Sequence, residues 1–171
     1  MRAVIQRVQN ASVVVNDEIV SQIGRGLCLL IGISRDDRPE DMDYMVRKIL
    51  SLRVFDSEDG KRWSDSVVDK KYEILSVSQF TLYSHLKGNK PDFHHAMDSK
   101  KSQLFYDQFV TKLRQSYESD LIKDGVFGAL MAVNICNDGP VTITLESPSL
   151  KQSSARHQTT DQIPDDRPNL L

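Results

Sequence analysis

The sequence has few of the residues that mark secreted, membrane-bound or strongly charged proteins. Its 171 residues include two cysteines, four histidines and one tryptophan, and the formal net charge is −2. Two cysteines provide no disulfide framework, and the near-neutral charge argues against a protein that coats nucleic acid electrostatically. No segment approaches the roughly 18 apolar residues of a membrane span, and the first residues include no apolar stretch of signal-peptide length. We therefore expect a cytoplasmic protein, compatible with a nuclear pool, that does not enter a membrane.

The composition that is present is ordinary for a globular domain, with 39% hydrophobic and 27% charged residues. We expect one domain over residues 1–149, because that length buries a real core. Residues 150–171 are polar and poor in large apolar side chains, which predicts a disordered tail. Cys28 and Cys136 each lie in an apolar run, which predicts two reduced thiols buried in the core.

The apolar pattern predicts more strands than helices. Alternating or continuous apolar runs indicate strands at 2–15, 18–23, 27–33, 52–55, 72–82, 127–136 and 141–146. A helix is expected over about 39–51, with Asp36 or Asp37 as its cap and Pro39 in its first turn, and a second over about 99–117. Residues 84–97 are expected to form a polar loop. The order of elements predicts an α+β fold, with a mostly antiparallel, barrel-like β core and two covering helices.

The dipeptide Gly139-Pro140 lies between two strand-like runs, where proline lacks the N–H that a β ladder needs. The simplest interpretation is a β-turn that closes a hairpin over 137–140. The functional interpretation is a cis peptide bond that directs the glycine carbonyl to a place that no ordinary turn reaches, although few X–Pro bonds are cis.

A second candidate site is the strand end formed by Ser78, Gln79, Phe80 and Thr81. Backbone N–H groups at the end of a strand can lack ladder partners, and such donors stabilise an oxyanion without a titratable side chain. The competing interpretation is a strand whose hydroxyl groups simply face water.

The remaining candidate chemistry is weaker. None of the four histidines lies in a recognisable nucleophile motif, so a Ser–His–Asp mechanism is disfavoured. His85, His94 and His95 could bind a metal, but no carboxylate or thiolate completes a convincing ligand set, and a solvated loop is the better interpretation. Lys87, Lys90, Lys100 and Lys101 suit either contact with nucleic-acid phosphate or a solvated surface.

Taken together, these segments resemble the D-aminoacyl-tRNA deacylases. The likeness covers roughly residues 1–147 and rests on separated matches at Val4–Val8, Arg47–Phe55, Ser78–Leu82, Lys87–Phe93, Phe127-Gly128 and Asn137–Thr142. The resemblance implies a homodimer with active sites at the subunit interface, a tRNA substrate and no cofactor or metal. It also implies hydrolysis of the ester that joins a D-amino acid, or mischarged glycine, to the terminal ribose.

The resemblance assigns roles to individual residues. Ser78, Gln79, Phe80 and Thr81 would line the catalytic pocket, where backbone N–H groups hold the amino acid and the developing oxyanion. Gly139-Pro140 would be a Gly–cisPro element that reaches into the partner's pocket, with Arg7 holding it in place. Phe127 and Met131 would pack against the terminal adenine, and Lys87 and Lys90 would contact tRNA.

Such a rigid backbone obstruction would reject L-residues by steric clash and tolerate glycine, which has no side chain. We expect Thr81 to position the substrate rather than act as an obligatory nucleophile, because no base is recognisable beside it. Three alternatives stay open: a non-hydrolytic nucleic-acid binding protein linked to DNA replication, a metal-dependent hydrolase, and a structural dimer that has lost its chemistry.

Overall fold

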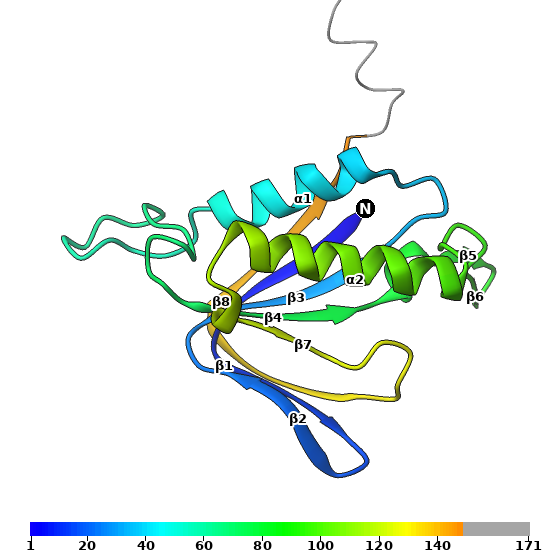
Figure 1. Cartoon of the computed structure of the whole chain (residues 1–171), viewed down its shortest axis with the longest axis horizontal. Helices are drawn as coiled ribbons and strands as arrows, with labels where there is room; N and C mark the ends of the chain where they lie inside the picture. The colour runs from blue at the N-terminus through cyan, green and yellow to red at the C-terminus, as the bar shows by residue number, and fades with distance from the viewer. Residues whose placement is uncertain (149–171) are drawn as a thin grey trace, which may run out of the picture.

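The computed structural model describes residues 1–148, and the expected tail at 150–171 lies outside the described residues. In these residues two α-helices lie on one side of a curved β-sheet (Figure 1). The strands of this sheet are β1 (Arg2–Val15), β2 (Glu18–Ile23), β3 (Gly26–Gly32), β4 (Glu73–Ser78), β7 (Ile122–Asp124) and β8 (Ala132–Glu146). The helices are α1 (Pro39–Ser51) and α2 (Ser99–Ser116). The expected α+β class is confirmed.

The sheet follows the order β2-β1-β3-β4-β7, and β8 pairs with the other edge of β1. β1 is antiparallel to β2, β3 and β8, whereas β3–β4 and β4–β7 are parallel. The long β1 strand thus pairs with β8 along most of its length, from Arg2 opposite Glu146 to Val14 opposite Ala132. This ribbon curves away from the helices (Figure 1) and forms, with β2, a separate lobe.

The helices cover the main core, and local sequence signals account for both of them. Helix α1 begins at Pro39 and carries Glu40 and Asp41 in its first turn, where acidic side chains favour the positive end of the dipole. Its buried face is Met42, Met45, Val46 and Ile49. Helix α2 is capped by the Asp98 carboxylate, which accepts from the N–H of Lys100 at 3.1 Å, and buries Tyr106, Phe109, Val110 and Leu113. Of the helices in residues 1–148, none has both the length and the apolar composition of a membrane-spanning helix.

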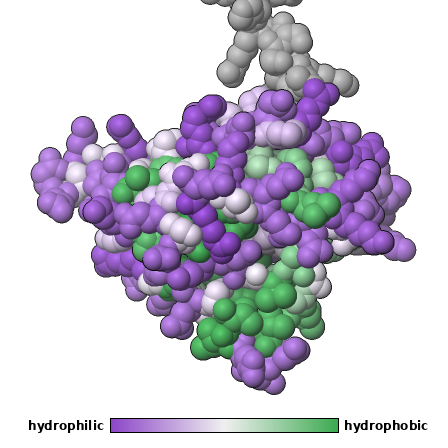
Figure 2. Space-filling view, in the orientation of Figure 1, coloured by the Kyte–Doolittle hydropathy of each residue, from purple (hydrophilic) through white to green (hydrophobic). Residues whose placement is uncertain are grey.

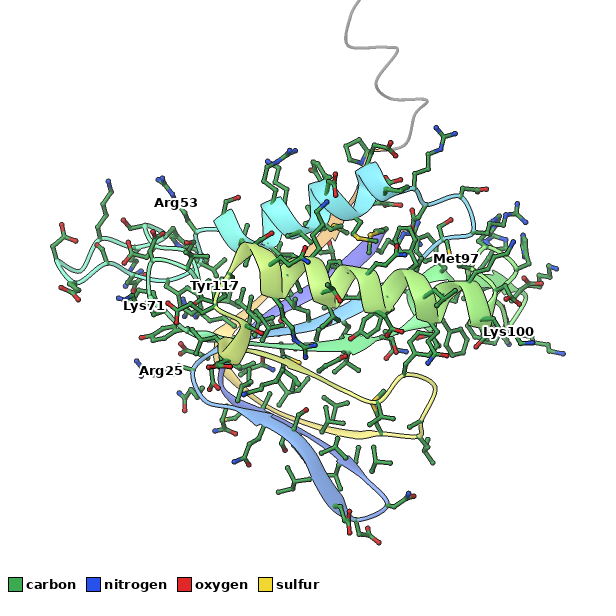
Figure 3. All side chains as sticks on the ribbon, viewed as in Figure 1. Arg25, Arg53, Lys71, Met97, Lys100 and Tyr117 are labelled. Atoms are coloured by element: carbon green, nitrogen blue, oxygen red, sulfur yellow. The ribbon has the colours of Figure 1, made fainter. Side chains whose placement is uncertain are left out.

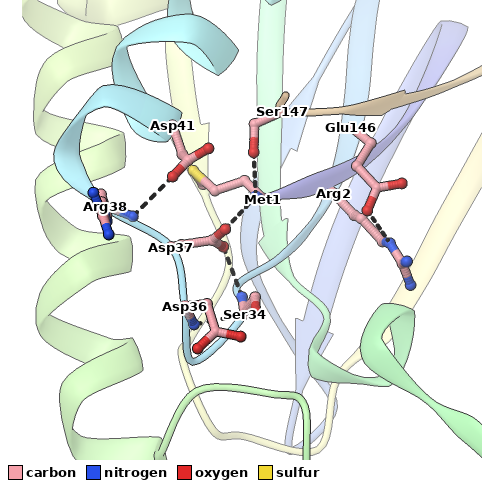
Figure 4. A network of polar contacts seen from close by, with 9 residues as sticks. All are labelled: Met1, Arg2, Ser34, Asp36, Asp37, Arg38, Asp41, Glu146 and Ser147. Carbon is pink, nitrogen blue, oxygen red and sulfur yellow. Dashed lines mark hydrogen bonds and ion pairs between the residues drawn. The ribbon is translucent and has the colours of Figure 1, made fainter. Parts of the chain in front are cut away.

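Asp37 does not cap helix α1 as the sequence suggested, because its carboxylate binds elsewhere. It accepts hydrogen bonds from the Met1 α-ammonium at 2.5 Å and from the Ser34 N–H at 2.7 Å (Figure 4). The Met1 ammonium also donates to the Ser147 hydroxyl at 2.6 Å. The start of β1, the end of β8 and the loop before α1 are therefore tied together, and the residue that flanks the helix is Arg38.

A second, smaller core cluster lies between the lobe that contains β2 and the face of β3 and β4 that the helices do not cover. It contains Val8, Ala11, Val13, Ile23, Cys28, Leu75 and Val77. Cys28 is buried as expected, and burial raises the pKa of its thiol to about 11. The expectation for Cys136 was wrong, because this thiol is exposed on β8. β2 exposes Ile19 and Val20, and Figure 2 shows hydrophobic surface gathered over this lobe.

Three other expectations about elements were wrong. Residues 52–55 form no strand beyond one isolated bridge between Phe55 and Asp65. The strand expected at 72–82 ends at Ser78 and continues as a 3-10 helix over Phe80–Tyr83. The loop expected at 84–97 includes a short hairpin of β5 (His85–Lys87) and β6 (Lys90–Asp92).

Candidate functional site

The end of β4 forms the first part of the site. Ser78 is the last residue of the strand and pairs with Ile31, and the Gln79 N–H donates to the Ile31 carbonyl at 2.7 Å. The chain then enters the 3-10 helix, whose first closing bond runs from the Leu82 N–H to the Gln79 carbonyl at 3.3 Å. The N–H groups of Phe80 and Thr81 precede this bond, so they have no acceptor within the helix. Their role as oxyanion donors stays a prediction.

The hydroxyl of Thr81 is held by an amide rather than by a base. The side-chain amide of Gln79 donates to Thr81 Oγ1, and Thr81 is exposed. Within residues 1–148 no histidine or carboxylate hydrogen-bonds this hydroxyl. The geometry therefore suits a positioning role for Thr81 better than activation as a nucleophile.

A cavity of about 770 Å³ adjoins this strand end. One wall contains Ser78, Gln79 and Phe80, and the opposite wall is the 127–131 segment between β7 and β8. The start of α2 and the side chains of Phe93, Ala96 and Met97 complete it. Phe80 and Phe93 meet edge to face with ring centroids 5.0 Å apart. The cavity thus combines apolar walls with a few polar groups, which is typical of a ligand pocket.

Two candidates for adenine contact lie in this cavity, and both are fixed by neighbours. The Phe127 ring packs on Tyr106 with centroids 5.7 Å apart. The sulfur of Met131 accepts from the Val126 N–H at 3.4 Å. The strand expected over 127–136 begins only at Ala132, which leaves 127–131 free to form the pocket wall.

Gly139-Pro140 lies elsewhere, and the hairpin expected there is wrong. β8 runs continuously through this dipeptide, and its peptide bond is cis. β1 pairs Arg7 with Val141 but Val8 with Asn137, so residues 138–140 bulge out of the ladder. Gly139 has φ of 116°, a value that favours glycine. Both residues of the dipeptide are exposed.

Arg7 anchors this bulge. Its Nε donates to the Asp138 carbonyl at 3.3 Å and lies 3.2 Å from the Asp138 carboxylate, while Nη1 donates to the Val54 carbonyl at 2.6 Å. The Arg7 side chain is only 17% exposed, so these bonds are largely shielded from water. A planar guanidinium makes such bonds in several directions at once.

The bulge and the pocket lie at opposite ends of the sheet. Val8, beside the bulge, pairs with Gly26 at the start of β3, whereas Ser78 pairs with Ile31 near its end. Five residues of strand span about 16 Å. Figure 3 shows the same separation, with Met97 of the pocket at one end of the molecule and Arg25, which adjoins Gly26, at the other. One chain therefore does not bring Gly139-Pro140 to its own pocket.

The other predicted residues lie on the β5–β6 hairpin. Lys87 forms an ion pair with Asp92, and the His94 imidazole also contacts that carboxylate. These partners hold the pKa of Asp92 far below its usual range, with the Lys87 bond as the largest cause. Lys90 is exposed, and neither lysine lines the pocket. Among residues 1–148 no group of three or more His, Cys, Asp or Glu is placed to hold a metal ion.

Sequence reasoning missed one buried polar group behind the pocket. The Tyr106 hydroxyl donates to Asp124 at 2.7 Å and lies 2.9 Å from the Ser76 hydroxyl. The only signal was a tyrosine on the apolar face of α2, whose hydroxyl needs a partner when buried.

These features define a class of protein: an α+β domain with an apolar pocket beside free backbone donors, suited to holding an activated ester. The family model described as D-Tyr-tRNA(Tyr) deacylase matches residues 4–146, and the chain belongs to this family. It is 60% identical over 149 residues to D-aminoacyl-tRNA deacylase 1 of Mus musculus, covering 87% of this chain and 71% of that protein. It is also 60% identical over 153 residues to the D-aminoacyl-tRNA deacylase of Drosophila melanogaster, covering 90% and 96%.

Two solved structures are similar. One, titled "c-Myc DNA Unwinding Element Binding Protein", superposes with a TM-score of 0.85 at 60% identity and covers 87% of this chain and all of that one. The other, a probable eukaryotic D-amino acid tRNA deacylase, has a TM-score of 0.72 at 21% identity and covers 85% and 98%. The second shows the fold alone. The family that the sequence motifs indicated is confirmed.

Proposed function

We propose that the protein hydrolyses the ester bond of D-aminoacyl-tRNA, releasing the free D-amino acid and tRNA, and likewise removes mischarged glycine. The observation that carries the proposal is the apolar pocket lined by Ser78, Gln79 and Phe80 at the end of β4, in a chain of this family. The terminal adenosine packs between Phe127 and Met131, and the aminoacyl ester lies against Ser78–Thr81. Backbone N–H groups of Phe80 and Thr81 then stabilise the negative charge that develops on the ester oxygen.

This chemistry needs no activated side chain. An aminoacyl ester is already reactive, and the neighbouring ribose 2′-hydroxyl helps to position or activate water. The protein contributes orientation and charge stabilisation, which together account for large rate effects. We propose a cytoplasmic location, where aminoacyl-tRNA is used, and cell fractionation tests it.

The test of the reaction is single-turnover hydrolysis of D-aminoacyl, L-aminoacyl and glycyl esters on matched tRNAs. We expect fast loss of the D and glycyl esters and preservation of the L ester. Hydrolysis of all three would retain the esterase and refute the exclusion of L-residues. Hydrolysis of none would refute the proposed function and favour a protein that only binds nucleic acid.

Replacing Thr81 by alanine separates positioning from nucleophilic attack. We expect a loss in rate of about tenfold or less, because Thr81 orients groups beside the ester and other donors remain. Single-turnover rates with a D-aminoacyl ester measure this. Complete loss of turnover by a folded Thr81→Ala variant would show that the hydroxyl is essential, and trapping of an acyl group on Thr81 would make Thr81 the nucleophile.

We further propose a homodimer in which Gly139-Pro140 of one subunit reaches into the pocket of the other. Two observations support it: the bulge lies at the opposite end of the sheet from its own pocket, and the lobe beside it has exposed hydrophobic surface, including Ile19 and Val20, that the helices do not cover (Figure 2). The Gly139 backbone then forms a wall of the partner's pocket. An L side chain would clash with this wall, whereas glycine, which has no side chain, would not.

Mixed dimers test this arrangement. Ala129→Trp fills the pocket, and Arg7→Ala releases the bulge, so each variant alone is expected to be inactive. Because a two-fold dimer mixes at random, a mixture of both variants should recover about a quarter of the wild-type activity. A mixture that stays inactive although heterodimers form would refute a site shared between subunits.

Arg7 is also expected to be sensitive to a conservative change. A lysine has one nitrogen and cannot reach both Asp138 and the Val54 carbonyl, so Arg7→Lys should lower kcat/KM by about tenfold or more through loss of orientation. Arg25→Lys is the matched control, because Arg25 and Arg7 both line a cavity of about 250 Å³ beside the bulge, but Arg25 is exposed. Equal activities of the two variants would contradict an anchoring role for Arg7.

A further inference from the structure

A second cavity, of about 310 Å³, lies next to the apolar pocket and is lined by donors. Its lining residues are Arg2, Ser34, Tyr83, Ser84, His85 and His95. Each of these side chains carries a hydrogen-bond donor in at least one protonation state or tautomer. Among residues 1–148, no aspartate or glutamate lines this cavity. A concave surface made of guanidinium, hydroxyl and imidazole groups suits an anion.

The two cavities are built from the same three segments of chain. Ile33 lines the pocket and Ser34 the donor cavity, and likewise Ala96 faces the pocket while His95 lines the donor cavity. Adjacent residues of an extended chain point in opposite directions, which accounts for this alternation. The segments are joined by an antiparallel bridge between Ser34 and Ala96 and by a bond from the Arg35 N–H to the His95 carbonyl at 3.0 Å.

The third shared segment is the 3-10 helix that carries Phe80 into the pocket. Its end, Tyr83, lines the donor cavity together with Ser84. Arg2 fixes this end, since Nη1 donates to the Leu82 carbonyl at 2.9 Å and the guanidinium lies 4.6 Å from the centre of the Tyr83 ring. A ligand in the pocket and an anion in the donor cavity would therefore contact opposite sides of one rigid unit.

The carboxylates that lie near the cavity are paired with cations. Nearby carboxylates already have cations: Glu146 pairs with Arg2 at 3.0 Å, Asp37 with the Met1 ammonium, and Asp36 with Arg35 at 3.8 Å (Figure 4 shows the first two pairs). The pKa of His95 is lowered, first by partial desolvation and then by the charges of His94, Arg35 and His85. Burial and the charges of Asp37 and Glu146 raise the pKa of Tyr83, whereas Arg2 lowers it, so the hydrogen-bond donors of the cavity, rather than a net positive charge, favour an anion.

We propose that this donor cavity binds a backbone phosphate of the RNA strand whose 3′ end occupies the apolar pocket. The inference rests on the proposed function, because it takes the pocket to hold the terminal adenosine. Phosphate contacts position a nucleic acid without reading its sequence. A phosphate held by Ser34, Ser84 and His95 would fix the strand on one side of the 3-10 helix and so direct the terminal nucleotide to the other.

The test introduces a carboxylate into the cavity. The two cavity variants are His95→Glu and Ser84→Asp, both at exposed positions. The control is Gln115→Glu, which adds the same charge at an exposed position in the last turn of α2. The measurements are the Kd of deacylated tRNA between 50 and 200 mM salt, about the range where phosphate contacts dominate, and the inhibition constant of adenosine, which has no phosphate.

We expect both cavity variants to bind tRNA about tenfold more weakly than the control at low salt. The slope of the logarithm of the binding constant against the logarithm of the salt concentration should be shallower by about one unit. Adenosine should inhibit all variants equally. Cavity variants that bind tRNA as the control does would overturn the proposal. If inorganic phosphate inhibits the control but not these variants, while tRNA affinity is unchanged, the cavity holds a free anion and the proposal is again wrong.

The outcome is separable from that of the proposed function. Hydrolysis of D-aminoacyl-tRNA by the wild type, together with unchanged tRNA affinity in the variants, would refute the phosphate site alone. A wild type that neither hydrolyses the ester nor binds tRNA would refute both.

Discussion

Replacing Gly32 by alanine is expected to lower kcat/KM for a D-aminoacyl ester by about 100-fold while the domain stays folded, because displacement by about 1 Å has effects of that size. Gly32 ends β3 directly beneath the 3-10 helix. A Cβ atom there would lie 2.9 Å from Leu82 Cβ and 3.2 Å from the Gln79 carbonyl oxygen. Ordinary carbon contacts need about 3.5–4.0 Å. Since β3 is held by β1 and β4, the 3-10 helix must move and carry the Phe80 and Thr81 N–H groups with it.

Gly24→Ala is the matched control for this change. Its Cβ would meet only the Glu73 carboxylate at 3.4 Å, an ordinary contact with the end of a flexible side chain. Single-turnover rates and the thermal midpoint of each variant separate misplacement from unfolding. A Gly32→Ala enzyme that turns over as the Gly24→Ala control does would show that the 3-10 helix does not set the catalytic geometry.

Local signals were sufficient to predict the elements whose formation depends on neighbouring residues. Helix α1 was predicted with its observed bounds, because Pro39, the acidic first turn and the apolar period all indicate the same helix. β3 was predicted as a strand buried on both faces, and all but one of its residues are buried. In these segments propensity, pattern and tertiary environment agree.

The errors lie where distant partners decide the conformation. Gly139-Pro140 breaks a strand rule, and a turn is the usual local solution, but here β1 pairs with the chain on both sides of the bulge and keeps it extended. The apolar pattern continues past Ser78 through Phe80 and Leu82, yet the strand ends at Ser78. The close approach of Gly32 to Leu82 that accompanies this end has no signal in the local sequence.

The buried hydroxyl of Tyr106 leads to the second large prediction. Tyr106 is 1% exposed and joins α2 to two strands, through Ser76 on β4 and Asp124 on β7. Both strands lead directly into pocket walls: β4 reaches Ser78 two residues later, and β7 is followed by the segment that includes Phe127 and Met131. Removing the hydroxyl should therefore affect both stability and the pocket.

Tyr106→Phe is expected to lower the free energy of unfolding by about 2–3 kcal/mol at neutral pH, because it leaves a largely buried carboxylate without its donor. Burial raises the pKa of Asp124, and the Tyr106 hydrogen bond partly offsets that rise. Without this donor the pKa in the folded state rises further above that in the unfolded state. The folded variant then binds the proton more tightly, so its stability falls as pH increases between the two pKa values.

The sign of this pH dependence separates a lost charge-stabilising bond from a simple packing defect. Denaturant titrations at several pH values between 4 and 8 should show the deficit of Tyr106→Phe growing as pH rises. Tyr117→Phe is the matched control, because the Tyr117 hydroxyl donates to the Tyr72 carbonyl at 3.0 Å and has no carboxylate partner among the described residues. Its smaller deficit, about 1 kcal/mol for a neutral hydrogen bond, should not change in the acidic part of this range. If the loss in free energy of unfolding of Tyr106→Phe were also independent of pH, the Tyr106 hydroxyl would not stabilise the charged form of Asp124. The positions of the two pocket walls would then not depend on a charge-stabilising bond from Tyr106.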